Sequence, residues 1–287
     1  MNHDRFLTRL LRQPAGAVGA LMLLAIAVLA LGAHWFYPGD PWAMVTDPNL
    51  PPFSPGFPLG TDMLGRDVAA GVAHGARVSL LIGIVATAVA VIVGTVLGAV
   101  AGYYGGWVDD FIMRFTEIFQ TIPGFLLALL MVAIFGPSMY SIVGAIGVIS
   151  WPSVARLVRA EFLSLRTRDF VKAAVLGGQS SARIVFRQIL PNTLSPIVVA
   201  ASLMMATAIL LESAISFLGL GDRSMISWGF MIGAGRTTLL QSWWLSAVPG
   251  VAIFITVLGL NLLGDALNQA LSPRRRQGGM HERTHIA

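Results

Sequence analysis

Residues 78–108 read VSLLIGIVATAVAVIVGTVLGAVAGYYGGWV, and none of them is Asp, Glu, Lys or Arg. An α-helix needs only ~20 apolar residues to cross the hydrocarbon core of a bilayer, so this run predicts a transmembrane helix. Four more uncharged stretches are long enough to cross, at residues 13–39, 118–155, 188–211 and 237–264. The chain is 55% hydrophobic and only 11% charged, well below the roughly 25% charge of soluble domains. We therefore expect an all-α integral membrane protein.

The longest uncharged stretch, 118–155, is too long for one crossing. Phe135-Gly136-Pro137-Ser138 interrupts it as a turn would, which divides it into two spans. The third span then carries Arg114 and Glu117 near its start. The first apolar run exceeds the roughly 7–15 residues of a signal-peptide core, which favours a retained span over a cleaved signal. The sequence thus predicts six transmembrane helices, near residues 16–36, 78–102, 112–134, 139–158, 194–218 and 245–268.

Positive charge predicts the orientation of these spans. All but four of the 19 Lys and Arg residues lie in the N-terminal segment, at Arg114, in the loop between the fourth and fifth spans, or in the tail. The positive-inside rule makes these segments cytoplasmic. Because this topology accounts for the formal charge of +5, that charge does not indicate nucleic acid binding. We expect a cytoplasmic segment at 1–15, a transmembrane domain at 16–272, external segments at 37–76 and 219–244, and a disordered cytoplasmic tail at 273–287.

Span two has a small residue at every fourth position. At that spacing small residues share one helix face and let a second backbone approach closely. A helix of the same subunit is the favoured partner, and a contact between subunits is the alternative. The residues of this small-residue face are Ala86, Ala90, Gly94, Gly98 and Gly102.

The two external segments have the composition of loops and interfaces. Segment 37–76 contains seven prolines, so it cannot be one continuous helix. Indole rings often anchor at membrane–water boundaries. We expect this of the second external segment, which carries Trp228, Trp243 and Trp244.

Several chemistries are excluded by residue content. Cysteine is absent, which excludes disulfides, thiolate metal sites and Cys nucleophiles. The only lysine, Lys172, follows Val171, whereas a Walker A loop needs Lys directly after Gly to reach the phosphates. The chain therefore cannot supply that phosphate-binding loop itself. His281-Glu-Arg-Thr-His285 matches H-E-x-x-H, but it lies two residues from the end with no apolar face to hold it. We interpret it as a chance match, not as a metal site.

The loop between the fourth and fifth spans, residues 159–192, is far longer than the roughly 2–8 residues of a plain connection. Apolar residues repeat with helical spacing on both sides of Gly177 and Gly178, which separate two helical halves. One interpretation is a basic amphipathic hairpin that lies on anionic lipid.

Ala173-Ala174, then Gly178 and Leu190-Pro191, resemble the EAA loop of ABC importer permeases. Lys172 departs from that pattern, because it stands where the family usually has Glu. Over nearly the whole chain, further strings are similar to the second permease of dipeptide, oligopeptide and nickel importers. They are PLGTDMLGRD at 58–67, GYYGGWVD at 102–109, ESAISFLGLG at 212–221 and NLLGD at 261–265.

This resemblance implies a type I importer permease fold in the bacterial inner membrane. It also implies a paralogous permease as heterodimer partner, two ATP-binding subunits that hold ATP and Mg, and a periplasmic or lipid-anchored solute-binding protein. No cofactor is expected in this chain. In the family, the short helix of the loop docks into a cleft of the ATPase subunit. The resemblance therefore assigns ATPase coupling to Arg166, Asp169, Phe170, Lys172, Ala173, Ala174, Gly177, Gly178 and Pro191.

Ionisable residues inside the spans are candidates for the substrate path, since a charge at mid-bilayer costs ~2.5–3.5 kcal/mol on insertion scales. The structural alternatives are that Glu212 caps a helix or pairs with an Arg, and that Arg114 pairs with Glu117 one turn away. The implied solute is a dipeptide, a longer peptide or a related compound such as a nickel chelate. A secondary transporter or channel is the alternative function, and it would need its own coupling-ion site. The path candidates are Glu212, Ser213, Ser216, Arg114 and Glu117.

Overall fold

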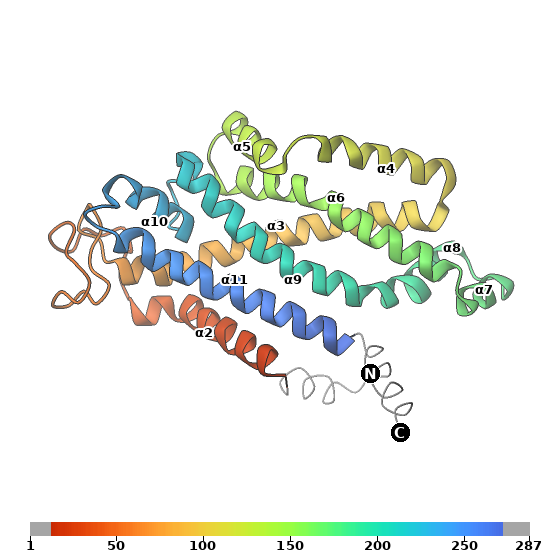
Figure 1. The fold of residues 1–287 in the computed structure, drawn as a ribbon, viewed down its shortest axis with the longest axis horizontal. Coiled ribbons are helices and arrows are strands. Elements are labelled where there is room, and N and C mark those ends of the chain that lie inside the picture. Colours follow the sequence, from red (N-terminus) through yellow and green to blue (C-terminus); the bar gives the residue numbers. More distant parts are fainter. Residues whose placement is uncertain (1–12, 272–287) are drawn as a thin grey trace, which may run out of the picture.

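The computed structural model describes residues 13–271, and these form helices and loops without a β-strand. The H-E-x-x-H string at 281–285 lies outside the described residues. The long helices lie side by side along the long axis of the molecule (Figure 1). The helices are α2 (Pro14–Phe36), α3 (Val68–Tyr104), α4 (Gly106–Thr121), α5 (Gly124–Phe135), α6 (Met139–Arg166), α7 (Asp169–Leu176), α8 (Ser181–Ile184), α9 (Leu190–Ile215), α10 (Trp228–Gly235) and α11 (Trp244–Leu271).

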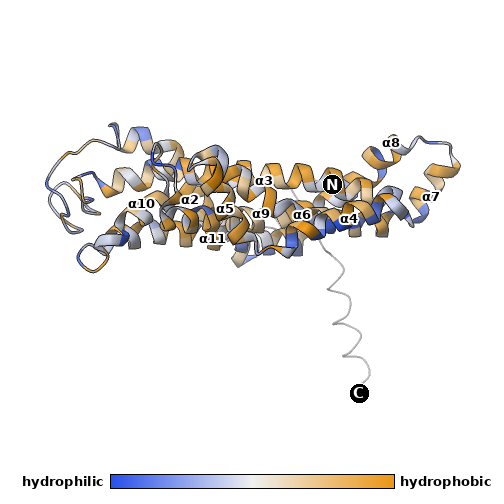
Figure 2. Ribbon diagram, turned by 90° about the horizontal axis from the view of Figure 1, so that it is seen from above, coloured by the Kyte–Doolittle hydropathy of each residue, from blue (hydrophilic) through white to orange (hydrophobic). Residues whose placement is uncertain are grey.

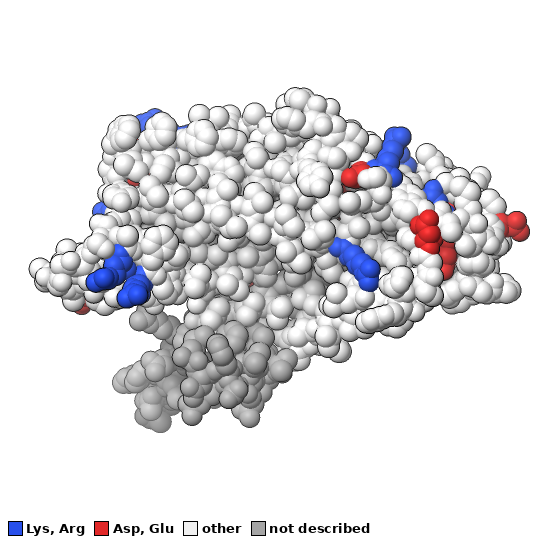
Figure 3. Space-filling model, turned by 180° about the vertical axis from the view of Figure 1, so that it is seen from behind, with Lys and Arg blue, Asp and Glu red and all other residues white. Residues whose placement is uncertain are grey.

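The two ends of the bundle carry different structures. Loop 37–67 and α10 lie at one end, which we call the α10 end, and α7 and α8 lie at the opposite, α7 end (Figure 1). Within residues 13–271, five helices are long and apolar enough to cross a membrane, and α4 with α5 raises the number to six if that bent pair is one span. On the face shown in Figure 3, charged side chains gather toward the two ends and leave an uncharged band between them. The predicted all-α membrane fold is confirmed; which end faces the cytoplasm stays a prediction.

The third span is broken, so the prediction of one continuous helix at 112–134 is wrong. α4 ends at Thr121, Ile122 is extended (φ −90°, ψ 131°), and α5 begins after Pro123 at an angle of 80° to α4. The proline ring disfavours helical geometry at the residue before it, and its nitrogen has no hydrogen to donate. Ile122-Pro123 therefore ends the helix in the middle of the apolar run.

The small-residue face of α3 packs against α6 within the same chain, as the favoured interpretation expected. A Cβ added to Gly98 would lie 2.4 Å from the backbone oxygen of Ala155, and one added to Gly94 would lie 2.7 Å from that of Trp151. Real Cβ atoms do not approach that closely, so only glycine permits this contact between two backbones. The α3–α6 contact is the most extensive between helices in the described chain.

α2 is held against α3 and α11. A Cβ on Gly19 would lie 2.9 Å from the backbone oxygen of Gly259 in α11. The guanidinium of Arg77 in α3 donates to the backbone oxygens of Ala30 and Leu31, the second over 2.7 Å. These carbonyls lie near the α10 end of α2, so Arg77 fixes that helix to the core with no acidic partner in the part of the chain that the structure describes.

Two of the three tryptophans expected at a boundary are buried instead. The indole nitrogen of Trp228 donates to the oxygen of Val72 over 3.0 Å, and that of Trp244 to the oxygen of Thr61 over 3.3 Å. Trp243 is 58% exposed, whereas Trp228 is fully buried. The buried indoles fix α10 and the start of α11 to α3 and loop 37–67.

Candidate functional site

α7 forms the tip of the α7 end. Val171 and Ala174 are buried, and they pack in one apolar cluster with Phe162 of α6 and residues of α8 and α9. The rest of the helix surface is exposed. Large exposed apolar side chains mark interaction surfaces. On α7 these are Phe170, Val175 and Leu176, the last of them 89% exposed.

The exposed charges of α7 add little to its stability. Lys172 Nζ lies 3.8 Å from Asp169 Oδ1, and both side chains are largely in solvent. Exposed ion pairs of this kind contribute at most about 1 kcal/mol. Of the two alanines assigned to coupling, Ala174 is buried and Ala173 is exposed beside Lys172.

Gly178 ends α7 through a specific hydrogen-bond pattern. The amide of Gly178 donates to the oxygen of Val175 over 3.0 Å, and the amide of Gln179 donates to the oxygen of Ala174 over 3.1 Å. This pair of bonds is a Schellman motif, in which the residue after the helix cap has a positive φ. Gly178 has φ 73°, while Gly177 before it has φ −75°. The positive φ explains why glycine suits position 178.

The chain returns to the bundle through α8 and a π-helical turn at Val185–Ile189. Pro191 follows as the second residue of α9, where it is exposed. A proline has no amide hydrogen for the preceding turn, and a widened π turn accommodates that loss. The predicted pair of helical halves is confirmed, with Pro191 on the returning half.

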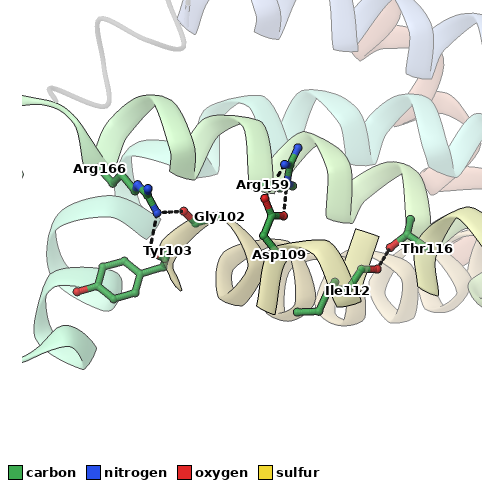
Figure 4. Close-up of polar contacts among 7 residues, drawn as sticks. All are labelled: Gly102, Tyr103, Asp109, Ile112, Thr116, Arg159 and Arg166. Atoms are coloured by element: carbon green, nitrogen blue, oxygen red, sulfur yellow. Dashed lines mark hydrogen bonds and ion pairs between the residues drawn. The ribbon is translucent and has the colours of Figure 1, made fainter. Parts of the chain in front are cut away.

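Arg166 contacts the end of α3 rather than the tip of the loop. Its Nη1 donates to the oxygen of Tyr103 over 3.0 Å and to that of Gly102 over 3.4 Å (Figure 4). These carbonyls end α3, just before Gly105 and Gly106 reverse the chain with φ 68° and 54°. Arg166 therefore joins the start of the α7 hairpin to the α3–α4 corner.

Sequence reasoning did not single out the ion pair between Arg159 of α6 and Asp109 of α4. Both guanidinium nitrogens Nε and Nη2 meet the carboxylate, Nη2 at 2.6 Å from Oδ2 (Figure 4). Asp109 is buried, with 10% of its side chain exposed. A signal was present, because Asp109 ends the string GYYGGWVD and Arg159 begins the long loop.

Arg114 and Glu117 do not form the predicted ion pair in the described chain, so that expectation is wrong. Both side chains are exposed on α4. Lone i, i+3 pairs are worth only about 0.2–0.5 kcal/mol, which is too little to hold two long side chains together by itself. Neither charge is buried inside the subunit, and the lining role predicted for them stays a prediction.

Glu212 is buried beneath α10 with 1% exposure. Its Oε1 accepts hydrogen bonds from Ser216 over 2.9 Å and from Ser227, the N-cap of α10, over 2.7 Å. Ser213 donates to the oxygen of Ile209 over 2.9 Å. A Cβ on Gly229 would lie 2.7 Å from Oε2, so α10 sits directly on the carboxylate. Glu212 therefore joins α9 to α10 through serine hydroxyls. Within residues 13–271 it neither caps a helix amide directly nor pairs with an Arg, and a contact with solute stays a prediction.

Comparison with known families agrees with this architecture. The family model described as "Binding-protein-dependent transport system inner membrane component" matches residues 94–277. The di/tripeptide transport system permease protein DppC of Pseudomonas aeruginosa is 40% identical over 267 residues, covering 90% of this chain and 88% of the relative. The oligopeptide transport system permease protein OppC of Escherichia coli is 40% identical over 273 residues, covering 93% and 90%.

Solved structures share the fold at lower identity. An inward-facing conformation of the MetNI methionine ABC transporter superposes with a TM-score of 0.58 at 20% identity, covering 70% of this chain and 96% of that one. An amino acid ABC transporter solved with histidines gives a TM-score of 0.55 at 16% identity, with 70% and 94% covered. At such identities the likeness concerns the fold alone.

Proposed function

Because the chain belongs to the family of binding-protein-dependent transport system inner membrane components, we propose that it is the permease subunit of a peptide-importing ABC transporter. The relatives at about 40% identity are named for di/tripeptide and oligopeptide transport. Peptides with free termini are accordingly the proposed solutes. The helix bundle supplies half of the route through the membrane, and a paralogous permease supplies the other half.

The observation that carries this proposal is that α7 has one buried face and one exposed apolar face. One side is fixed to the bundle by Val171 and Ala174, and the other presents Leu176 and Phe170 to solvent. A short helix held rigidly, with an apolar outer face, is suited to dock into a cleft of a partner protein. We propose that this partner is an ATPase subunit and that the α7 end is cytoplasmic, as the Lys and Arg distribution favours.

Energy enters from outside this chain in our proposal. Lys172, the only lysine of the chain, stands on α7 and not in a glycine-rich phosphate loop, so this chain does not bind ATP in such a loop. We therefore assign the binding of ATP and Mg to two partner subunits. A periplasmic or lipid-anchored binding protein delivers the peptide to the α10 end. Movement of α7 reaches the α3–α4 corner through Arg166, which links the two.

The predicted path residues fall into two groups in this scheme. Arg114 and Glu117 are exposed on α4 and line the path directly. Glu212, Ser213 and Ser216 lie under α10, so they line the path only in a state in which α10 moves away.

The test is reconstitution of the four membrane-associated subunits in proteoliposomes with the binding protein. We expect uptake of a radiolabelled dipeptide to require ATP and Mg, and to be insensitive to collapse of ion gradients. Leu176→Asp should abolish co-purification of the ATPase subunits. Leu240→Asp is the matched control, since Leu240 is also a largely exposed leucine, near the α10 end. Uptake driven by an ion gradient without the ATPase subunits would establish the secondary transporter instead.

A further inference from the structure

One face of α4 carries polar side chains that the bundle does not bury. Asp110, Arg114, Glu117 and Thr121 follow i, i+4, i+7, i+11 spacing, and at 3.6 residues per turn they lie within about 60° of one another. All four are exposed. Figure 2 shows hydrophilic positions along α4, beside helices that are largely hydrophobic. We call these four residues the polar stripe of α4.

The polar stripe points away from the rest of the subunit. Ile112 and Phe119 lie on the opposite side of α4, about half a turn from the stripe. Ile112 is buried, and the ring of Phe119 packs on Trp151 of α6 with centroids 5.4 Å apart. Since α6 covers that side, the charged side chains extend outward from the subunit.

The stripe lies among the spans, in the half of the bundle nearer α7. Phe115, the neighbour of Arg114, stacks on Trp151 at 5.9 Å, and Trp151 lies near the midpoint of the 28-residue α6. The oxygen of Trp151 faces Gly94, ten residues before the end of α3 at Tyr104. Arg114 and Glu117 therefore lie about 15 Å inside that end, in the half of the bundle nearer α7. At that depth ionisable side chains face protein or water and not lipid.

α4 has a second exposed face, and it is apolar. Trp107, Phe111 and Ile118 are 78%, 62% and 65% exposed, and the rings of Trp107 and Phe111 stack at 5.9 Å. This face suits lipid or the apolar surface of another subunit. The stripe beside it is the face suited to a water-filled route.

We propose that the polar stripe of α4 is a binding site for zwitterionic short peptides in the half of the route nearer α7. The proposal rests on the proposed function and deepens it. Charge alternates along the stripe as negative, positive, negative. Arg114 binds the peptide carboxylate, and Asp110 or Glu117 binds the ammonium group, through charge-assisted hydrogen bonds.

The spacing matches small peptides. At 1.5 Å per residue, Asp110 lies about 6 Å from Arg114 along the helix axis, and Glu117 lies about 4.5 Å beyond Arg114. An extended chain advances ~3.3–3.6 Å per residue, so a dipeptide reaches from an acidic residue to Arg114 with its two charged ends. Thr121 extends the polar surface by one further turn.

The experiment measures thiol protection in the purified transporter complex without binding protein. The chain has no cysteine, so Thr121→Cys gives one reporter on the stripe and Ile118→Cys gives a control on the apolar face. We expect a hydrophilic thiol reagent to label Thr121→Cys and not Ile118→Cys. Dialanine with free termini should slow that labelling at least about fivefold, while C-amidated and N-acetylated dialanine should not.

Arg114→Gln in the Thr121→Cys background should raise the dialanine concentration for half-protection about tenfold or more, as loss of a charged hydrogen bond would. Gln120→Ala changes a residue of the same helix outside the stripe, and it should leave the dialanine concentration for half-protection unchanged. Equal protection by all three dialanine forms would overturn the proposal. So would loss of the partner permease from Arg114→Gln complexes, because the stripe would then be a subunit contact. ATP-dependent uptake by the wild-type complex tests the proposed function separately.

Discussion

Arg159 and Asp109 form a bidentate ion pair that joins α6 to α4 across 50 positions of sequence. Arg166 lies two turns further along α6 and holds the last carbonyls of α3. Both arginines therefore act on the same feature, the α3–α4 corner. Through them, the helix that leads into α7 is fixed to both arms of that corner.

Arg159→Gln should destabilise the subunit by about 1–3 kcal/mol, because it leaves the buried carboxylate of Asp109 without its partner. The loss is smaller than for a fully buried pair, since 34% of the Arg159 side chain is exposed. The apparent melting temperature in detergent measures it. Arg156→Gln, an exposed position of α6, should change little. The double variant with Asp109→Asn should recover part of the loss; unchanged melting of the single variant would contradict this role.

Gly98→Ala should disrupt the α3–α6 contact. The added methyl group would lie 2.4 Å from the backbone oxygen of Ala155, and a backbone atom cannot move aside as a flexible side chain can. We expect a cost of about 1–3 kcal/mol from overpacking, seen as a lower melting temperature. Gly144→Ala is the matched control, because a Cβ there meets open space within the chain. If the two variants melt alike, the backbone contact does not determine stability.

Asp222 should make stability depend on pH. Partial burial alone raises the pKa of its carboxyl, but hydrogen bonds from Ser224 and from the amide of Met139 outweigh burial and hold the pKa below its usual 3.8. A lowered native pKa stabilises the fold above the unfolded pKa, and that contribution is lost as pH falls through the native pKa. Asp222→Asn should therefore melt lower at pH 7, by at most about 1 kcal/mol of stability, because solvent screens a carboxylate that is only partly buried.

The same comparison at pH 3 should show a smaller difference, because protonation removes the wild-type advantage. Asp47→Asn serves as the control, because Asp47 is exposed and a substitution there should change stability little. A difference that stays constant from pH 7 to pH 3 would mean that the carboxylate charge does not stabilise the start of α6.

The membrane spans could be predicted because hydropathy and length report directly on lipid contact. The α3–α6 contact could be predicted because small residues recur every fourth position. The break in the third span had a signal, Ile122-Pro123, but the apolar run continues through it. Hydropathy reports the length of an apolar segment and not a change in the direction of its helix axis. The bend between α4 and α5, which is 80°, is expected only if Pro123 is interpreted as a helix breaker.

Contacts between distant helices could not be predicted in this way. Helical periodicity says which residues share a face, but it does not say which residue of another helix lies opposite. Arg159 with Asp109 and Glu212 with Ser227 both depend on that register. The same limit misplaced Trp228, because an indole in a short external segment fits a boundary as well as a buried contact.

The orientation of the bundle can be tested in the cysteine-free chain. We expect Leu240→Cys to react with a membrane-impermeant thiol reagent in intact cells, and Arg168→Cys to react only after permeabilisation. Both positions are exposed. Arg168 directly precedes α7 and Leu240 lies between α10 and α11. These helices mark opposite ends of the bundle (Figure 1), so access and not burial determines labelling. The expectation follows from the excess of Lys and Arg near α7. Labelling of Arg168→Cys in intact cells would show that the topology is the reverse of the predicted one.

Gly178→Val should uncouple or disassemble the transporter while the subunit still inserts in the membrane. A Cβ at this position meets no neighbour within 4 Å, so the effect comes from the backbone. The φ of 73° costs a residue with a side chain roughly 1–2 kcal/mol, and a β-branched residue resists it most. The end of α7 would then unwind or turn differently and displace Leu176. Co-purification of the ATPase subunits and peptide-stimulated ATP hydrolysis measure the result.

The backbone origin of this effect can be separated from added bulk by a series of substitutions. Asn tolerates positive φ, so Gly178→Asn should retain most of the coupling that Gly178→Val loses. Gly177→Ala should be mild, because Gly177 has φ −75° and already fits an L-residue. A hairpin that only rests on lipid predicts the opposite order, since apolar bulk is welcome at an interface and a polar amide is not. If Gly178→Val retains the ATPase subunits and stimulated hydrolysis at wild-type levels, α7 does not carry the coupling contact.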